Sequence, residues 1–407
     1  MTQPTVLDLF SGCGGLSLGL AEAGFDIKWA NECDEFAADS FRNAHQNTSV
    51  FCEDVSRFYS RTLENDRGCP TRGELDLLTG GPPCQGFSGY NRHRSPDDPR
   101  NSLVEVFLDF VDLLEPRYVL MENVPGMLSL DGGAVVAQVM SAFEQLEYTA
   151  HLGILQAGYY GLPQNRWRVF IWASRKAGEL PEFPEPTHLF TRTTIFGATK
   201  FRENVIKPPT SGSSLFWKPE TMVTVADAIR DLPPIENGQA LESRGYASKA
   251  LSDFQKRMRK ESNGVFDHCT KKLGDLMMQR CRAVPKKPGA GWLDLPEELK
   301  PENLKRHGDR RYDNRFGRLH WEGTFNTILS DAHPYWGRVF HPAQDRVISV
   351  REAARAQGFP DNVRFCGSKT RKYRQVGNAV PPPLAFELGK SLMSVLCQKG
   401  QKKRGKK

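Results

Sequence analysis

Short apolar runs alternate with amphipathic runs through the first 180 residues, and this alternation limits the fold more than any other feature of the sequence. Apolar runs of strand length lie at residues 5–10, 27–31, 75–79, 118–122 and 168–173. Runs with helical spacing lie between them, at residues 16–23, 35–43, 104–114 and 134–146. Strand–helix alternation of this kind predicts an α/β fold, with a mostly parallel sheet covered by helices on both faces.

The alternation stops at a proline-rich segment near residue 185, where we place a domain boundary. Periodicity is weak through residues 186–374, which predicts a smaller and irregular second domain. An apolar helical pattern near the C-terminus is expected to pack back onto the first domain. We therefore predict a first domain of residues 1–185 that is completed by residues 375–398, followed by a basic, disordered tail at 399–407.

Charge is unevenly distributed along the chain. Residues 1–180 carry 14 Lys+Arg against 24 Asp+Glu, whereas residues 181–398 carry 35 against 24, and the last nine residues add six basic and no acidic side chains. A basic second half suggests a polyanionic partner, and nucleic acid and a merely solvated basic surface remain equally open on charge alone. The sequence shows no run approaching the roughly 18 apolar residues that a membrane span needs, so we expect no membrane partner.

The nine cysteines are odd in number and form no Cys-X-X-Cys pair. This argues against a disulfide framework and against a structural zinc site, so we expect no metal. A reducing, intracellular compartment suits such cysteine usage best.

A glycine-rich turn at residues 8–15 follows the first strand pattern and opens the first helix pattern. Gly12 and Gly14 permit a tight turn and a close approach of the backbone to a ligand. Glu32 ends the next strand, where a ribose-binding acid belongs in a nucleotide-binding fold. Because the glycine spacing is not that of a dinucleotide site, an adenosine ligand without pyrophosphate is favoured, S-adenosylmethionine above all. A purely structural turn is the alternative.

A second motif at residues 80–88 lies at the carboxyl end of another strand pattern, the edge at which open α/β sheets bind ligands. Pro82 and Pro83 stiffen the backbone before Cys84, and a polar run at 89–102 follows. A thiol held in this way is typical of a nucleophile beneath a lid, although many free cysteines are simply packed.

Three weaker motifs follow. Glu122 ends a strand pattern and could act as a general acid. Arg166 and Arg168 alternate at the entry to a strand, which predicts that both lie on one face. Residues 375–381 precede the last helix pattern, and Gly-Asn at 377–378 predicts a tight turn there.

Taken in this order, the motifs resemble those of the cytosine-C5 DNA methyltransferase family. The matching segments are residues 8–15, 82–85, 122–124, 164–168, 351–360 and 375–381. Further segments are similar to the catalytic domain of the eukaryotic maintenance (CpG) enzymes, at residues 101–104, 153–158, 183–186, 225–233 and 316–319. One departure is the segment 293–313, which is short and holds no cysteine where that subgroup has a zinc-binding insert.

The resemblance implies a Rossmann-like, S-adenosylmethionine-dependent methyltransferase domain with a target-recognition domain, and double-stranded DNA as substrate. It gives Cys84 the role of nucleophile at cytosine C6, and Glu122 that of hydrogen-bonding and protonating N3. Arg168 would hold the base carbonyl and Arg166 would support Cys84. The cofactor-binding residues that it implies are Phe10, Ser11, Gly12, Gly14, Glu32, Cys33, Asp54, Val55, Pro83, Leu103 and Asn378. Within that set, Phe10 would stack near the cofactor, Glu32 would bind its ribose, and Asp54 and Val55 its adenine.

Three alternatives remain open to different degrees. A tRNA-methylating relative is disfavoured, because about 190 residues separate Phe183 from Tyr373 and that branch has a much smaller recognition region. An inactive DNA-binding homologue is disfavoured because Cys84, Glu122 and both arginines are present. A nicotinamide oxidoreductase does not suit the glycine spacing. The expected location is the nucleus in a eukaryote, and the cytoplasm or nucleoid in a bacterium.

Overall fold

The computed structural model describes residues 3–83, 102–175, 178–191, 199–209, 218–305 and 312–404. Its contacts divide the chain into two compact units. The first unit consists of Met1–Tyr160, Trp167–Glu220 and Val380–Lys407, and the second of Gly161–Arg166 and Thr221–Ala379. Each unit is described separately below.

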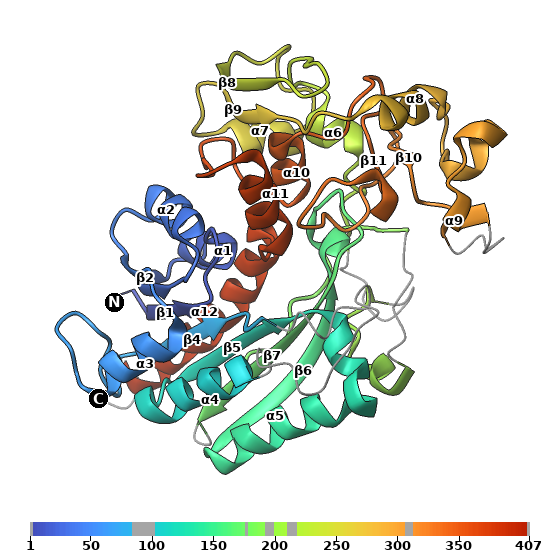
Figure 1. Ribbon diagram of the computed structural model, residues 1–407. Coiled ribbons are helices and arrows are strands. Elements are labelled where there is room, and N and C mark those ends of the chain that lie inside the picture. Colours follow the sequence, from blue (N-terminus) through green and yellow to red (C-terminus); the bar gives the residue numbers. More distant parts are fainter. Residues whose placement is uncertain are drawn as a thin grey trace. The chain divides into compact units, whose positions relative to one another are not determined.

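A seven-stranded sheet forms the centre of the first unit (Figure 1). Its strands are β1 (Thr5–Leu9), β2 (Asp26–Asn31), β3 (Ser49–Phe51), β4 (Leu77–Gly80), β5 (Tyr118–Asn123), β6 (Tyr148–Gln156) and β7 (Trp167–Arg175). They run in the order β3-β2-β1-β4-β5-β7-β6. The first five are parallel, whereas β7 is antiparallel to both β5 and β6. The α/β fold class predicted from the sequence is therefore confirmed.

The strand order reverses between β1 and β4, both of which pair with other parallel strands. In an open α/β sheet, ligands bind outside the carboxyl ends of the strands at such a reversal. The loops that leave these ends are residues 10–14 after β1 and 81–83 after β4. The fold thus brings the first sequence motif and residues 80–83 of the second to one edge of the sheet.

Helices cover both faces of this sheet. They are α1 (Gly15–Glu22), α2 (Glu35–Ala44), α3 (Val55–Leu63), α4 (Ser102–Leu114), α5 (Ala134–Gln145) and α12 (Pro382–Arg404), with 3-10 turns η3 (Pro125–Gly133), η4 (Ala157–Tyr160) and η5 (Thr199–Asn204). Figure 1 shows α4 and α5 across the near face, with α12 passing behind. The contact between α1 and α12 is close, because a Cβ added to Gly19 would collide with the carbonyl oxygen of Pro382.

The last helix is longer than the sequence pattern predicted. It continues to Arg404, so residues 399–404 are helical where a disordered tail was expected, and residues 405–407 lie outside the described part. Lysine, arginine and glutamine have good helix propensity, and cations are favourable near a helix C-terminus.

The segment Pro125–Gln145 has the length and apolar composition of a membrane-spanning helix, contrary to the expectation that no run comes close. It is not one continuous helix, since Asp131 and Gly132, near the end of η3, have positive φ. The second part, α5, buries one face through Val136, Val139 and Phe143. A single buried stripe is the pattern of a helix that packs on a sheet.

The first unit extends further than the boundary predicted near residue 185. Contacts keep residues 186–220 with it. His188 and Glu220 form an isolated β-bridge, and a Cβ added to Gly158 would collide with the ring of Phe190. The proline-rich segment marks the end of the regular strand–helix alternation. The contacts, in contrast, divide the two units after Glu220.

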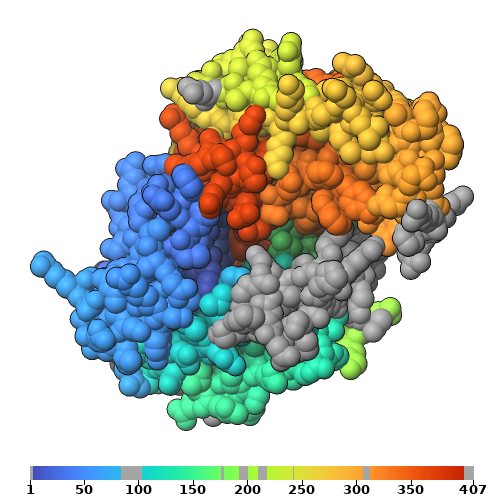
Figure 2. Space-filling view, viewed as in Figure 1, coloured from blue at the N-terminus to red at the C-terminus, as the bar shows by residue number. Residues whose placement is uncertain are grey.

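The second unit consists of short elements, as the weak periodicity predicted. The helices are α6 (Val225–Ile229), α7 (Asp253–Arg259), α8 (Asp275–Ala283), α9 (Glu302–Lys305), α10 (Val350–Ala356) and α11 (Lys369–Asn378). The 3-10 turns are η6 (Trp292–Asp294), η7 (Glu297–Leu299) and η9 (Pro334–Trp336). Two small sheets pair β8 (Ala240–Arg244) with β9 (Val265–Cys269), and β10 (Gly317–Arg318) with β11 (Arg338–Phe340). Figure 2 shows its yellow and orange-red segments, far apart in the sequence, side by side on one face.

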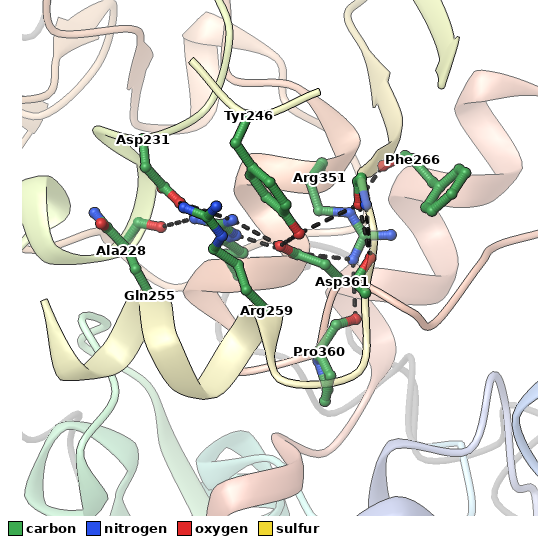
Figure 3. A network of polar contacts seen from close by, with 12 residues as sticks. Ala228, Asp231, Tyr246, Gln255, Arg259, Phe266, Arg351, Pro360 and Asp361 are labelled. Carbon is green, nitrogen blue, oxygen red and sulfur yellow. Dashed lines mark hydrogen bonds and ion pairs between the residues drawn. The ribbon is translucent and has the colours of Figure 1, made fainter. Parts of the chain in front are cut away.

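Charged side chains occupy the interior of the second unit. Arg355 on α10 is fully buried and forms ion pairs with Asp231 and Asp361. Tyr246 donates a hydrogen bond of 2.8 Å to Asp361, toward which it points in Figure 3. Arg351, also fully buried, donates to the carbonyl of Phe266 at 2.8 Å. Part of the positive charge counted in the second half of the sequence therefore lies inside the unit instead of on its surface.

The tight turn predicted at residues 377–378 is wrong, because both residues belong to α11. A Cβ added to Gly377 would collide with the backbone of Leu329. Glycine is required here for close packing of a helix end, a need that a local sequence pattern does not distinguish from a turn.

Candidate active site

The loop after β1 has the backbone of a ligand-binding turn. Phe10, Gly12 and Gly14 have φ of 55°, 56° and 87°, and Gly14 is the N-cap of α1. A Cβ on Gly14 would lie 2.9 Å from the Phe41 ring and 3.0 Å from His45 Nε2, whereas one on Gly12 would meet no described atom within 4 Å. Gly14 is thus packed from behind, and the Gly12 backbone faces open space that a ligand can approach.

Glu32 connects this loop to the end of β2. Its Oε2 accepts a hydrogen bond from Gly12 N at 2.8 Å, and its Oε1 accepts one from Asp34 N at 2.8 Å. Each carboxylate oxygen has a second lone pair. A carboxylate fixed in this way is suited to accept hydrogen bonds from the hydroxyl groups of a ribose.

Asp8 supports the loop from inside the sheet and was not among the predicted site residues. It is buried in β1 and accepts a hydrogen bond of 2.6 Å from Ser17 on α1. Burial raises its pKa to about 7, despite the opposing effect of that hydrogen bond. The signal in the sequence was an acidic residue within an otherwise apolar strand pattern.

His45 also supports the loop and gave no signal in the sequence. Burial lowers its pKa to about 4, so the imidazole is neutral at neutral pH. Its ring lies 4.5 Å from that of Phe41, and both rings pack against Gly14.

The remaining predicted adenosine contacts in the first unit lie after β2 and β3. Asp54 caps α3 by accepting a hydrogen bond from Ser56 N at 2.9 Å, and Val55 is buried behind it. Cys33 is exposed. Ser11 Oγ is buried and has no hydrogen-bond partner among the described residues. An orphaned hydroxyl, an approachable glycine and a fixed carboxylate fit a polar adenosine ligand such as S-adenosylmethionine.

Glu122 and Arg168 form an ion pair at the same sheet edge. Arg168 Nε lies 2.9 Å from Glu122 Oε1, and each side chain is 10% exposed. Glu122 is the second-last residue of β5, and Arg168 belongs to the neighbouring antiparallel strand β7. A Cβ added to Gly81 would lie 2.9 Å from Glu122 Oε2, so the carboxylate lies against the loop after β4.

That loop leads to the predicted nucleophile. The carbonyl of Pro82 accepts a hydrogen bond of 3.4 Å from the side chain of Asn123. Pro83 is the last residue described before a gap, and Cys84 lies outside the described residues. Leu103, another predicted cofactor contact, lies in the first turn of α4 and is partly buried.

The two arginines predicted to share a face bind different groups. β7 begins at Trp167, so Arg166 precedes the strand, and its contacts place it in the second unit. Arg166 is fully buried and donates to the carbonyls of Ile328 and Gly377 at 3.0 Å and to that of Ala379 at 2.9 Å. Asn378, the last predicted cofactor contact, is exposed at the end of α11.

Comparison with known families identifies the chain. A family model described as C-5 cytosine-specific DNA methylase matches residues 4–394. The chain belongs to this family. Among the described residues, no group of three or more His, Cys, Asp or Glu side chains could hold a metal ion.

The relatives of this chain include plant and animal proteins. It is 37% identical to DNA (cytosine-5)-methyltransferase 1A of Oryza sativa subsp. japonica, over 97% of this chain and 28% of that protein. It is 38% identical to DNA (cytosine-5)-methyltransferase 4 of Arabidopsis thaliana, again over 97% and 28%. For DNA (cytosine-5)-methyltransferase 1 of Mus musculus the identity is 35%, over 94% and 28%. The chain thus spans under a third of the length of these relatives.

Solved structures share the fold. One is a candidate DNA modification methyltransferase encoded within an E. coli prophage, with a TM-score of 0.68, 27% identity, and coverage of 97% of this chain and 99% of that one. Another is the S. pombe Dnmt2 methyltransferase, with a TM-score of 0.52, 17% identity, and the same coverage. At 17% identity the second likeness concerns the fold alone.

Proposed function

We propose that this chain transfers a methyl group from S-adenosyl-L-methionine to C5 of cytosine in double-stranded DNA. The observation that carries the proposal is the Glu122–Arg168 pair, which lies against the loop that leads directly to Cys84. An acid, a cation and a thiol from three different segments are what addition to a pyrimidine ring requires.

The proposed chemistry begins with a base turned out of the DNA stack, because C6 cannot be reached inside a duplex. The Cys84 thiolate adds to C6, and the electron pair of the C5–C6 bond makes C5 nucleophilic. C5 then takes the methyl group that the sulfonium of S-adenosylmethionine supplies. Loss of the C5 proton and of the Cys84 sulfur restores the aromatic ring.

Glu122 and Arg168 have complementary parts in this proposal. Glu122 hydrogen-bonds and protonates cytosine N3, which helps the ring to accept the thiolate. Arg168 fixes the orientation of Glu122 at 2.9 Å and holds the carbonyl of the base. Arg166 would support the Cys84 loop, as the family resemblance implies.

The cofactor would be held by the loops at the carboxyl ends of β1, β2 and β4. Glu32, with both oxygens fixed, would bind the ribose, and Asp54 and Val55 would bind the adenine. Phe10 would stack near the cofactor. The other proposed contacts are Ser11, Gly12, Gly14, Cys33, Pro83, Leu103 and Asn378.

We further propose that the target is CpG, and that the second unit faces the DNA. The support for CpG is the similarity of residues 316–319 and 225–233 to the CpG enzymes. The relatives that are 35–38% identical are named DNA methyltransferases, which favours DNA over tRNA as the substrate. The proposed location is intracellular: the nucleus in a eukaryote, or the cytoplasm or nucleoid in a bacterium.

A labelled methyl-transfer assay on DNA and on tRNA tests the activity, with Cys84→Ala as the inactive control. We expect transfer to DNA only, and only by the unsubstituted chain. Bisulfite sequencing of DNA from a methylation-free bacterial strain that expresses the chain reports the target. A non-CpG pattern would overturn the target, and transfer to tRNA alone would overturn the substrate.

A further inference from the structure

Two loops of the second unit meet where the small sheet of β10 and β11 begins (Figure 1). The two strands are parallel, with Gly317 opposite Arg338, so the loop before β10 and the loop before β11 lie side by side. The amide of Phe316 in the first loop donates a hydrogen bond of 2.7 Å to the carbonyl of Pro334 in the second. The fold thus holds residues 312–316 against η9.

Arg315 is enclosed by aromatic rings from both loops. Its guanidinium carbon lies 4.1 Å from the centroid of the Tyr312 ring, 4.2 Å from that of Tyr335 and 5.9 Å from that of Trp336. Only 7% of Arg315 is exposed. A guanidinium stacks favourably on aromatic faces, which leaves its N–H edge as the part that can still bind a partner.

The guanidinium of Arg315 has no hydrogen-bond or ion-pair partner among the residues that the structure describes. Asp313, in the same loop, pairs with Arg338 at 3.7 Å instead. An arginine has five N–H donors, and buried donors in folded proteins almost always have partners. The nitrogens of Arg315 are not fully enclosed, so the donor edge reaches the surface. A stacked and buried arginine with an open donor edge indicates a site for an acceptor outside the chain.

The shape of this site favours a planar partner with two neighbouring acceptors. The tyrosine rings restrict the plane of the guanidinium fork, and a phosphate, whose oxygens are tetrahedral, does not require a fixed plane. Among the base edges in the major groove of DNA, guanine alone presents two acceptors side by side, O6 and N7, and arginine can donate to both. Trp336, 42% exposed, offers apolar surface to a neighbouring base.

We propose that Arg315 is a specificity-determining residue that reads a guanine of the CpG step by donating two hydrogen bonds, to O6 and N7. The inference rests on the proposed function, in which the second unit faces the DNA. Lysine cannot replace arginine in this role, because its ammonium group has no planar fork. A base contact changes the choice of sequence, whereas a phosphate contact changes affinity for all sequences alike.

The test compares kcat/KM for methyl transfer by the full chain on two duplexes. One has guanine at the CpG step and the other has 7-deazaguanine there in both strands, with carbon in place of the N7 acceptor. The unsubstituted chain loses about tenfold in kcat/KM on the second duplex. Arg315→Lys loses about tenfold on the guanine duplex, and its values on the two duplexes agree within about twofold, because both changes remove the same contact.

Arg364 provides a matched control in the same unit. Its guanidinium also stacks on an aromatic ring, at 3.8 Å from the centroid of Phe266, but the residue is exposed. Arg364→Lys therefore removes the same planar group from a surface position. We expect kcat/KM within about twofold of the unsubstituted value and the full discrimination between the two duplexes.

A phosphate contact predicts a different pattern. Arg315→Lys would keep its affinity because it keeps the charge, and Arg315→Met would weaken binding to both duplexes equally and lower the salt slope of binding by about one. A purely structural role predicts equal losses on the two duplexes in Arg315→Lys, with the discrimination retained. Either pattern, or an equal loss in Arg364→Lys, would overturn the guanine contact.

The measurement on the unsubstituted chain needs no variant. Equal transfer to the two duplexes overturns the guanine contact alone, whereas transfer to neither overturns the proposed function and this inference with it. If Arg315→Lys does not fold, Arg315→Met takes its place, because its apolar chain can still pack between the rings. Retained discrimination in that variant counts equally against the proposal.

Discussion

Two groups of arginine and carboxylate side chains, one in each unit, differ in how much of their surface stays accessible. In the second unit, Arg355 pairs with Asp231 and Asp361, and none of these three side chains is exposed. In the first unit, Arg168 pairs with Glu122, and each side chain keeps 10% of its surface exposed at the edge of the sheet. We call Arg355, Asp231 and Asp361 the closed group; it stabilises a unit with few regular elements. We call Glu122 and Arg168 the open pair; it can meet a substrate.

The charges of the closed group explain why its carboxylates stay ionised although solvent does not reach them. Burial by itself would raise the pKa of Asp361, but the charge and hydrogen bonds of Arg355 outweigh it and lower the pKa. The carboxylate thus stays ionised, and each ion depends on the other. The general lesson is that an arginine–carboxylate pair indicates a reaction only where a substrate can reach it.

The largest expected effect is on activity at the open pair. Glu122→Gln removes the acid and should lower kcat by about 10²- to 10⁴-fold while cofactor binding is preserved, measured by methyl transfer and calorimetry. Glu115→Gln is the matched control, because Glu115 pairs with Arg175 at the other end of β5. Activity of Glu122→Gln within about fivefold of that control would show that the pair has no part in the chemistry.

The next effect is on stability at the closed group. Arg355→Met leaves two buried carboxylates with less compensation and should cost about 3–5 kcal/mol in the free energy of unfolding. Lys256→Met, which breaks an exposed pair with Asp253, should leave the free energy of unfolding almost unchanged. Denaturant titration measures both. Equal losses would mean that burial does not separate the two kinds of pair.

Asp8 extends the comparison of buried carboxylates, because its partner is the neutral hydroxyl of Ser17 and not an arginine. The pKa of Asp8 is raised to about 7, so the folded chain keeps its proton where the unfolded chain has lost it. The stability that this gives is complete below about pH 4 and is lost as the pH rises to about 7, by roughly 2–4 kcal/mol. Asp8→Asn should therefore gain stability relative to the original chain between pH 5 and pH 8. A difference independent of pH would contradict the raised pKa.

The smallest effect concerns discrimination by the second unit. Distinguishing a methyl group from hydrogen on the parental strand needs an apolar pocket, and one such contact is worth roughly 1 kcal/mol. Since residues 293–313 hold no cysteine-rich insert, we expect methylation of unmethylated CpG with at most a modest preference for hemimethylated DNA. Rates on two duplexes that differ only in that methyl group measure it. A preference above about thirtyfold, roughly 2 kcal/mol, would refute the expectation.

The sequence predicted the sheet better than the second unit, for a physical reason. Strands such as β5 are buried along their whole length, so apolar runs revealed them. Strands β3 and β6 were not predicted, and the three residues of β3 carry little periodicity. Strand β7 was predicted at residues 168–173, but its antiparallel direction leaves no local signal. Charge counting also treated Arg351 and Arg355 as surface residues, because partners such as Phe266 and Asp231 lie far away in the sequence.

The sequence predicted those residues of the candidate site that belong to a motif at the end of a strand. Glu122 and Arg168 are paired, and Glu32 is held by Gly12, while the placement of Cys84 lies outside the described residues. Asp8 and His45 were missed because they act behind the loop through tertiary packing.

Covalent trapping tests the central claim most directly, since it reports the bond between Cys84 and the base. DNA that contains 5-fluorocytosine at the target should form a stable adduct with the full chain in the presence of S-adenosyl-L-methionine, because fluorine at C5 blocks the final elimination. Denaturing electrophoresis should show the adduct with the unsubstituted chain and none with Cys84→Ser, whose hydroxyl is far less nucleophilic than a thiol near pH 7. An adduct formed by Cys84→Ser, or none formed by an active unsubstituted chain, would contradict the account.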